Sequence, residues 1–80
     1  MKTFIFGKTL KDGEYYKLRQ FLTQADVITS PYPLKNYPGC TVHLIGPYYL
    51  AEKWPEMEEF LLNNRQKMGI NIMNMEWDCD

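Results

Sequence analysis

The sequence lacks a long apolar run and carries little net charge of either sign. A helix that crosses a bilayer needs about 20 consecutive apolar residues, so we expect no membrane segment. The apolar run near the start is also too short for a secretory signal, and we expect no targeting segment. Nine basic residues against ten acidic ones give a formal charge of −1. Such a balance offers no general attraction to nucleic acid or to an anionic membrane.

Cysteine and histidine are also scarce. The cysteines are Cys40 and Cys79, far apart and outside any spacing typical of a metal site, and His43 is the single histidine. Because a zinc site needs more sulfur or nitrogen ligands, we predict no metal and no cofactor. We expect two reduced thiols in a cytoplasmic protein, although pairing of the two cysteines stays open.

What the sequence does contain is a good supply of core-forming residues. Apolar residues make up 45% of the 80 residues and aromatic residues 15%. This composition predicts a folded chain of one domain, with the aromatic side chains compensating for the small size.

The first half of the chain predicts a strand, a helix and a second strand. Residues 3–7 form a short run of β-forming residues that ends at a glycine. Asp12 is the predicted N-cap of the helix, which should end near Ala25, and residues 27–29 predict the second strand. Spacings of three and four place five helix residues on the expected core face: Tyr15, Leu18, Phe21, Leu22 and Ala25.

The second half repeats this plan. Residues 40–46 predict a strand, and residues 70–77 predict the last one. Between them, Pro55 suits the first turn of a helix and Gly69 suits its C-terminal cap. The residues expected on the core side of this helix are Trp54, Met57, Phe60, Leu61 and Met68.

The two halves align at an offset of 39 residues. Gly7 and Gly46 each precede a Phe-Leu pair by 14 residues, without a gap. This fixed distance predicts two β-α-β half-units, about 3–30 and 41–77, joined by the proline-rich loop 31–40.

Two such units in series predict a single ferredoxin-like βαββαβ domain over residues 1–80. In that α+β fold a four-stranded antiparallel sheet carries both helices on one face, and the other face is open to solvent or to a partner. The alternative is a three-stranded parallel βαβαβ sheet, which would apply if residues 27–30 formed a loop instead of a strand.

No motif predicts catalysis. Gly7-Lys8-Thr9 resembles the end of a phosphate-binding loop, but the earlier glycine of such a loop is missing, so we interpret the tripeptide as a strand exit. Cys40 and His43 lie three residues apart in one predicted strand, where their side chains should point to opposite faces. We therefore predict no catalytic residues and no enzymatic activity. An enzyme that uses His43 with Cys40 or Cys79 remains an alternative.

The strongest functional candidates are aromatic residues in turn-rich segments, together with the acidic end of the chain. Tyrosine and tryptophan provide much contact area at little cost in side-chain entropy, which suits an interface. The acidic end could contact a basic partner. The predicted partner-binding residues are Tyr32, Tyr37, Tyr48, Tyr49, Glu76, Trp77 and Asp78.

We therefore expect a small non-catalytic module that binds an unidentified protein partner, such as a regulator or inhibitor of the kind that phages and mobile elements encode. A homodimer through the sheet face or edge is a further expectation. The alternative is weak binding of single-stranded nucleic acid or of a nucleotide through Lys2, Lys8, Lys11 and nearby tyrosines. Nucleic acid is disfavoured because the predicted third strand has no aromatic residue on which a base could stack.

Overall fold

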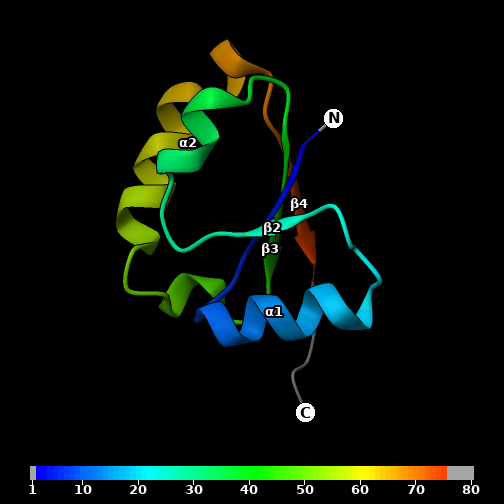
Figure 1. The fold of residues 1–80 in the computed structure, drawn as a ribbon. Coiled ribbons are helices and arrows are strands. Elements are labelled where there is room, and N and C mark those ends of the chain that lie inside the picture. The colour runs from blue at the N-terminus through cyan, green and yellow to red at the C-terminus, as the bar shows by residue number, and fades with distance from the viewer. Residues whose placement is uncertain (1, 76–80) are drawn as a thin grey trace.

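The computed structural model describes residues 2–75 and contains four strands and two α-helices (Figure 1). In chain order these are β1 (Thr3–Phe6), α1 (Leu10–Arg19), β2 (Asp26–Val27), β3 (Thr41–Ile45), α2 (Trp54–Met68) and β4 (Asn71–Met75). Two short 3₁₀ helices, η1 (Tyr32–Asn36) and η2 (Tyr48–Leu50), lie in the connections. The strands form one sheet in the order β2-β1-β3-β4, and every neighbouring pair is parallel.

The predicted antiparallel ferredoxin-like sheet is therefore wrong, and the parallel βαβαβ alternative is closer. After β2 the chain does not turn back as a hairpin. Residues 28–40, which include η1, return the chain to the end of the sheet at which β1 begins. β3 therefore runs alongside β1 in the same direction. The sequence carries one sign of this arrangement. Phe4, Ile5 and Phe6 are all buried, and strands that are apolar on both faces are typical of parallel sheets.

The two helices cover opposite faces of the sheet, which corrects the prediction that both lie on one face. Alternate residues of the central strands belong to two separate cores. The α2-side core contains, among others, Phe4, Phe6, Val42, Leu44, Met57 and Leu61. The α1-side core is smaller and contains Ile5, Tyr16, Ala25 and Ile45. Opposite faces follow from right-handed crossovers, because β1 connects to β2 in one direction across the sheet and β3 connects to β4 in the other.

The boundaries of α1 differ from those predicted. Thr9 is its N-cap, because the Asp12 N–H donates to Thr9 Oγ1 at 3.2 Å, and the helix ends at Arg19. Phe21 then adopts a left-handed backbone conformation with φ 54°, which a continuing helix cannot accommodate. The second strand is accordingly shorter and earlier than predicted, at Asp26–Val27.

The face of α1 that meets the sheet is also different from the predicted one. Leu18 is 74% exposed and Phe21 is 86% exposed, whereas Tyr16 is only 2% exposed. Gly13 explains this orientation, since a Cβ at that position would lie 2.3 Å from Val27 Cγ1. The helix therefore approaches β2 closely through its glycine, and Tyr16 fills the neighbouring space.

The predictions for α2 agree better with the structure. Pro55 lies in the first turn, and Gly69 caps the C-terminus in the left-handed conformation with φ 65°. Met57 and Leu61 are buried, and Trp54, Phe60 and Met68 pack against the same α2-side core. The core face predicted for this helix is confirmed.

Candidate functional site

The sheet has a topological switch point, a place where the connections that follow two neighbouring strands lead to opposite faces of the sheet. β1 and β3 are adjacent and parallel, but β1 leads into α1 on one face and β3 leads through η2 into α2 on the other. The segments that follow the two strands therefore diverge and leave a crevice between them. In open sheets with helices on both faces, ligands bind in this crevice, outside the carboxyl ends of the strands.

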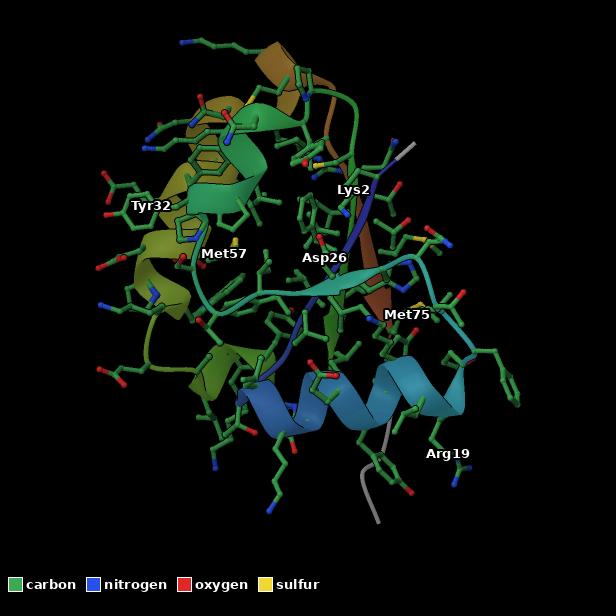
Figure 2. The ribbon with its side chains drawn as sticks, viewed as in Figure 1. Lys2, Arg19, Asp26, Tyr32, Met57 and Met75 are labelled. Carbon is green, nitrogen blue, oxygen red and sulfur yellow. The ribbon has the colours of Figure 1, made fainter. Side chains whose placement is uncertain are left out.

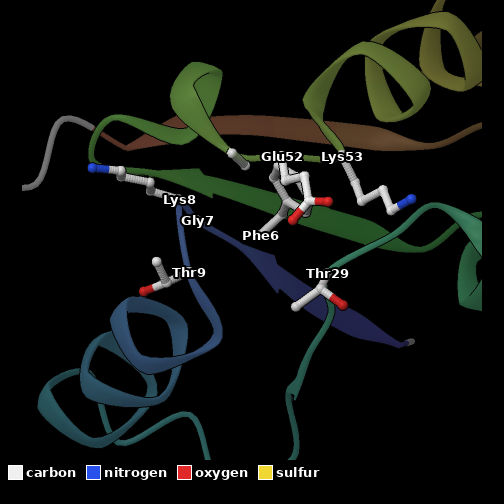
Figure 3. A pocket seen from close by; sticks show the side chains of 8 residues that line it. Phe6, Gly7, Lys8, Thr9, Thr29, Glu52 and Lys53 are labelled. Carbon is white, nitrogen blue, oxygen red and sulfur yellow. The ribbon is translucent and has the colours of Figure 1, made fainter.

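A pocket of ≈ 310 Å³ lies at this switch point (Figure 3). Its lining comes from the exit of β1, from the segment after β2 and from the segment before α2. The lining residues are Phe6, Gly7, Lys8, Thr9, Thr29, Ala51, Glu52 and Lys53. Phe6 and Ala51 are buried, so the base of the pocket is apolar, whereas the remaining side chains provide hydroxyl, carboxylate and ammonium groups at its rim.

Gly7 and Thr9 shape the exit of β1. A Cβ on Gly7 would lie 3.0 Å from Ile45 Cγ1 and 3.2 Å from Ile45 Cδ1, so the absence of a side chain lets β1 leave the sheet close to the end of β3. Thr9 then begins α1, and the positive end of that helix dipole lies beside the pocket. α2 also begins at the carboxyl end of the strands, immediately after Lys53.

The charged groups of the pocket are free to rearrange. Lys53 Nζ lies 3.7 Å from Glu56 Oε1, but both side chains are about half exposed, and such a surface pair adds little stability. Lys8 forms no ion pair with any residue between 2 and 75. In Figure 3 the Glu52 carboxylate lies between the two lysines, which extend away from it in opposite directions.

His43 lies outside this pocket, on the α1 face of the sheet. Its Nδ1 is 3.2 Å from the Tyr16 hydroxyl, and the two rings meet edge to face with their centroids 5.9 Å apart. Burial lowers the pKa of His43 and raises the pKa of Tyr16, so both groups are favoured in their neutral forms. A neutral His43 that carries its proton on Nε2 can accept a hydrogen bond from the Tyr16 hydroxyl at Nδ1.

Cys40 belongs to the α2-side core, so Cys40 and His43 lie on opposite faces of the sheet. Burial raises the pKa of the Cys40 thiol, which reduces its thiolate fraction at neutral pH. The two side chains therefore do not form a nucleophile–base pair. Within the described part of the chain, no group of three or more His, Cys, Asp or Glu residues is placed to hold a metal ion.

The predicted partner-binding tyrosines are not brought together. Tyr37 packs edge to face on Phe4, near the start of β1, with ring centroids 5.5 Å apart. Tyr48 and Tyr49 follow the opposite, carboxyl end of β3. Tyr32, on η1, is exposed beneath Lys35, whose Nζ lies 4.9 Å from the ring centroid.

Tyr48 is the least available of these tyrosines. Its ring packs on Trp54 with the centroids 4.9 Å apart, and Asn74 Nδ2 donates to its hydroxyl at 3.1 Å. The other three predicted contact residues, Glu76, Trp77 and Asp78, lie outside the described residues.

Of the residues that line the pocket, Thr29, Glu52 and Lys53 carry no motif in the sequence. Gly7, Lys8 and Thr9 form the strand exit that the sequence predicts, but this exit opens into the pocket. The signal that could have identified the site is topological. Once β1 and β3 are known to be adjacent and parallel, the residues that follow each strand become the first candidates.

Comparison of the chain with models of protein families, with curated proteins and with solved structures gave no match, so its function is inferred from its own geometry. Neither α1 nor α2, the α-helices of residues 2–75, is long and apolar enough to cross a membrane.

Proposed function

We propose that this protein binds a small phosphorylated ligand of the nucleotide class at the carboxyl edge of its sheet. The observation that carries the proposal is the position of the pocket, which coincides with the switch point between β1 and β3. At ≈ 310 Å³ the pocket lies at the lower end of the range for small-molecule sites, which is about 300–1,000 Å³. This size favours a mononucleotide over a dinucleotide.

The chemistry of the lining matches the three parts of a nucleotide. Lys8 and Lys53 provide positive charge for a phosphate, and their flexible stems allow the ammonium groups to turn toward it. The N-termini of α1 and α2 add favourable potential at the same edge. The Glu52 carboxylate can accept hydrogen bonds from sugar hydroxyls, and the buried Phe6 offers apolar surface to a base.

The proposal can be tested by isothermal titration of the purified protein with AMP, GMP, CMP and UMP, and with the corresponding nucleosides as ligands without phosphate. Lys8→Ala should weaken nucleotide binding about ten-fold or more, because a charge-assisted contact of roughly 1.5–3 kcal/mol is lost. Lys11→Ala is the matched control, since Lys11 is an exposed lysine of α1 that does not line the pocket. Equal losses in the two variants, or no binding of any nucleotide at millimolar concentration, would refute the proposal.

Protein binding is the second candidate. The observation that favours it is the exposure of Tyr32, Tyr37 and Tyr49, three of the predicted contact residues. Tyr37 lies near the start of β1 and Tyr49 follows the carboxyl end of β3, whereas Tyr32 lies on η1 beside α2 (Figure 2). A partner that contacts Tyr32 would therefore use a different surface from one that contacts Tyr49. Affinity capture that compares the wild-type protein with Tyr32→Ser and with Tyr49→Ser separates the two surfaces. If neither substitution removes any captured protein, this candidate fails.

A cytoplasmic location is part of the same proposal. Cys40 is a buried free thiol, which is the usual state of cysteine in a reducing compartment. Fractionation of cells that express the tagged protein tests this location.

A further inference from the structure

The two edges of the sheet are built differently. β2 forms one edge with only two residues, and Asp26 at this edge pairs with Lys2 at an Nζ–Oδ2 distance of 2.6 Å. Short length and charge are common means of preventing an edge strand from pairing with another chain. β4 forms the other edge with five residues, NIMNM, which include no charge, proline or glycine.

The outer edge of β4 presents a row of backbone hydrogen-bonding groups. The Asn71 N–H donates to the Cys40 carbonyl at 2.9 Å, so the backbone of Asn71 faces β3. Because these groups alternate along a strand, Ile72 and Asn74 direct their N–H and C=O groups away from β3. Among residues 2–75 no strand pairs with this side of β4.

The α1 face of β4 is open at Asn71 and Met73, whereas Met75 packs against the α1-side core. α1 packs on β1 and β2, at the other side of the sheet. Met73, on the α1 face of β4, is 44% exposed, and Asn71 on the same face is also exposed. The α2 face of β4 is occupied instead, because Ile72 packs on the α2-side core and Asn74 bonds to Tyr48.

We infer that the β4 edge binds a second copy of this chain, with the two β4 strands antiparallel about a two-fold axis. An antiparallel pair of identical strands is self-complementary, so one surface serves both copies. The absence of charge in residues 71–75 means that no like charges meet at this edge. The two four-stranded sheets would become one continuous sheet of eight strands, and the exposed edge of each would be removed.

The alternation of backbone groups also sets the register. The register that overlaps all five residues of both strands places Ile72 of each copy opposite Asn74 of the other, and these pairs exchange hydrogen bonds. Met73 of one copy then lies directly opposite Met73 of the other, as a non-hydrogen-bonded pair with Cα atoms about 4.5 Å apart. The two exposed methionines would cover each other on the α1 face.

Site-specific cross-linking in the full chain tests this geometry. Met73→Cys, in a Cys79→Ser background, should form a covalent dimer on mild oxidation, because a directly opposed pair satisfies the Cα separation of a disulfide. Asn71→Cys in the same background is the matched control. It lies on the same face and is also exposed, but the inferred register places it opposite Met75 and not opposite itself. Non-reducing electrophoresis measures both variants.

Sedimentation velocity gives the second readout. The wild-type protein should sediment as a dimer with twice the monomer mass of 9.5 kDa. Met73→Lys places like charges opposite each other and should raise the dimer dissociation constant at least ten-fold, while circular dichroism shows an unchanged fold. The inference is overturned if the wild type is a monomer up to millimolar concentration. It is equally overturned if Met73→Cys cross-links no faster than Asn71→Cys, since a dimer would then use another surface or another register.

Discussion

The two β-α-β halves share the order of their elements but differ in how each helix meets the sheet. Met57 of α2 is 0% exposed, whereas Leu18 of α1, which aligns with it at the offset of 39 residues, is 74% exposed. α2 contacts its core through large apolar side chains, and α1 makes its closest approach through Gly13. Matching apolar letters in a repeat therefore do not guarantee matching burial.

The largest expected difference in stability is between alanine substitutions at the aligned positions Met57 and Leu18. Met57→Ala should lower the free energy of unfolding by about 2–5 kcal/mol, because it leaves a cavity in the α2-side core. Leu18→Ala should change the same quantity by less than about 0.5 kcal/mol, because the side chain is already in solvent. Urea denaturation of both variants measures the difference. Similar losses at the two sites would restore the predicted core face of α1 and contradict the structure.

The close approach of α1 predicts the next largest effect. Gly13→Ala should lower the free energy of unfolding by about 1–3 kcal/mol, because the new methyl group overlaps Val27 and displaces the helix. Glu14→Ala is the control, as an exposed neighbour in the same helix. The double variant Gly13→Ala, Val27→Ala should recover part of the loss. A stabilised Gly13→Ala protein would mean that helix propensity outweighs the contact.

The α1 half also contains a polar pair that predicts a pH dependence. Tyr16→Phe should lower the free energy of unfolding by about 0.5–1.5 kcal/mol at neutral pH, because the contact with His43 is lost. Burial lowers the pKa of His43 in the folded protein, so the unfolded chain binds this proton more readily. Stability should therefore fall as the pH drops below about 6.5, the ordinary pKa of histidine.

The contribution of His43 is isolated by comparing the wild type with His43→Gln in urea melts between pH 7.5 and 5.5. The wild type should lose more stability than the variant over this interval. Parallel pH profiles would assign the dependence to other groups.

The two helix ends provide the last comparison, and there we expect small effects of opposite sign. Residues in the left-handed conformation follow both helices, but α2 uses Gly69 there and the segment after α1 uses Phe21. Phe21→Gly should raise the thermal midpoint by relieving roughly 1 kcal/mol of backbone strain, since the phenyl ring is exposed and little packing is lost. Gly69→Ala should lower the midpoint by a similar amount. Opposite shifts of the two midpoints in calorimetry would agree with this difference, and shifts of the same sign would not.

The sequence predicted α2 well because several independent signals agree there. Pro55, Gly69 and the apolar spacing all indicate the same helix, and each is confirmed. The face of α1 that meets the sheet could not be predicted from the sequence. The apolar spacing indicates a face that contains Leu18 and Phe21, which are exposed. Gly13, which makes the close contact with β2, has no side chain and so contributes nothing to an apolar pattern. The contact between Gly13 and Val27 is a tertiary contact, and the local sequence carries no signal of it.

Sheet topology was the second limit. The prolines of residues 28–40 indicate a connecting segment. Its composition does not predict whether β3 pairs with β1 or with β2, or in which direction β3 runs. The antiparallel prediction failed at this point, and the pocket was missed for the same reason. Gly7 to Thr9 and Ala51 to Lys53 lie together only because β1 and β3 are parallel neighbours.

The central position of β1 has a consequence for how the protein acquires its structure. This strand precedes the other three in the chain, yet its neighbour β3 starts 38 residues later, since Thr3 pairs with Thr41. Pairing between such distant segments requires a large loop to close, and the entropy cost of closure comes before the stabilising contacts form. Chains dominated by such pairings fold in about milliseconds to seconds. Phe4 and Phe6 also share their core with Val42, Leu44, Met57 and Leu61, all of which belong to the second half of the chain. We therefore expect that the two halves, although alike in plan, do not fold independently and that the chain folds in one cooperative step.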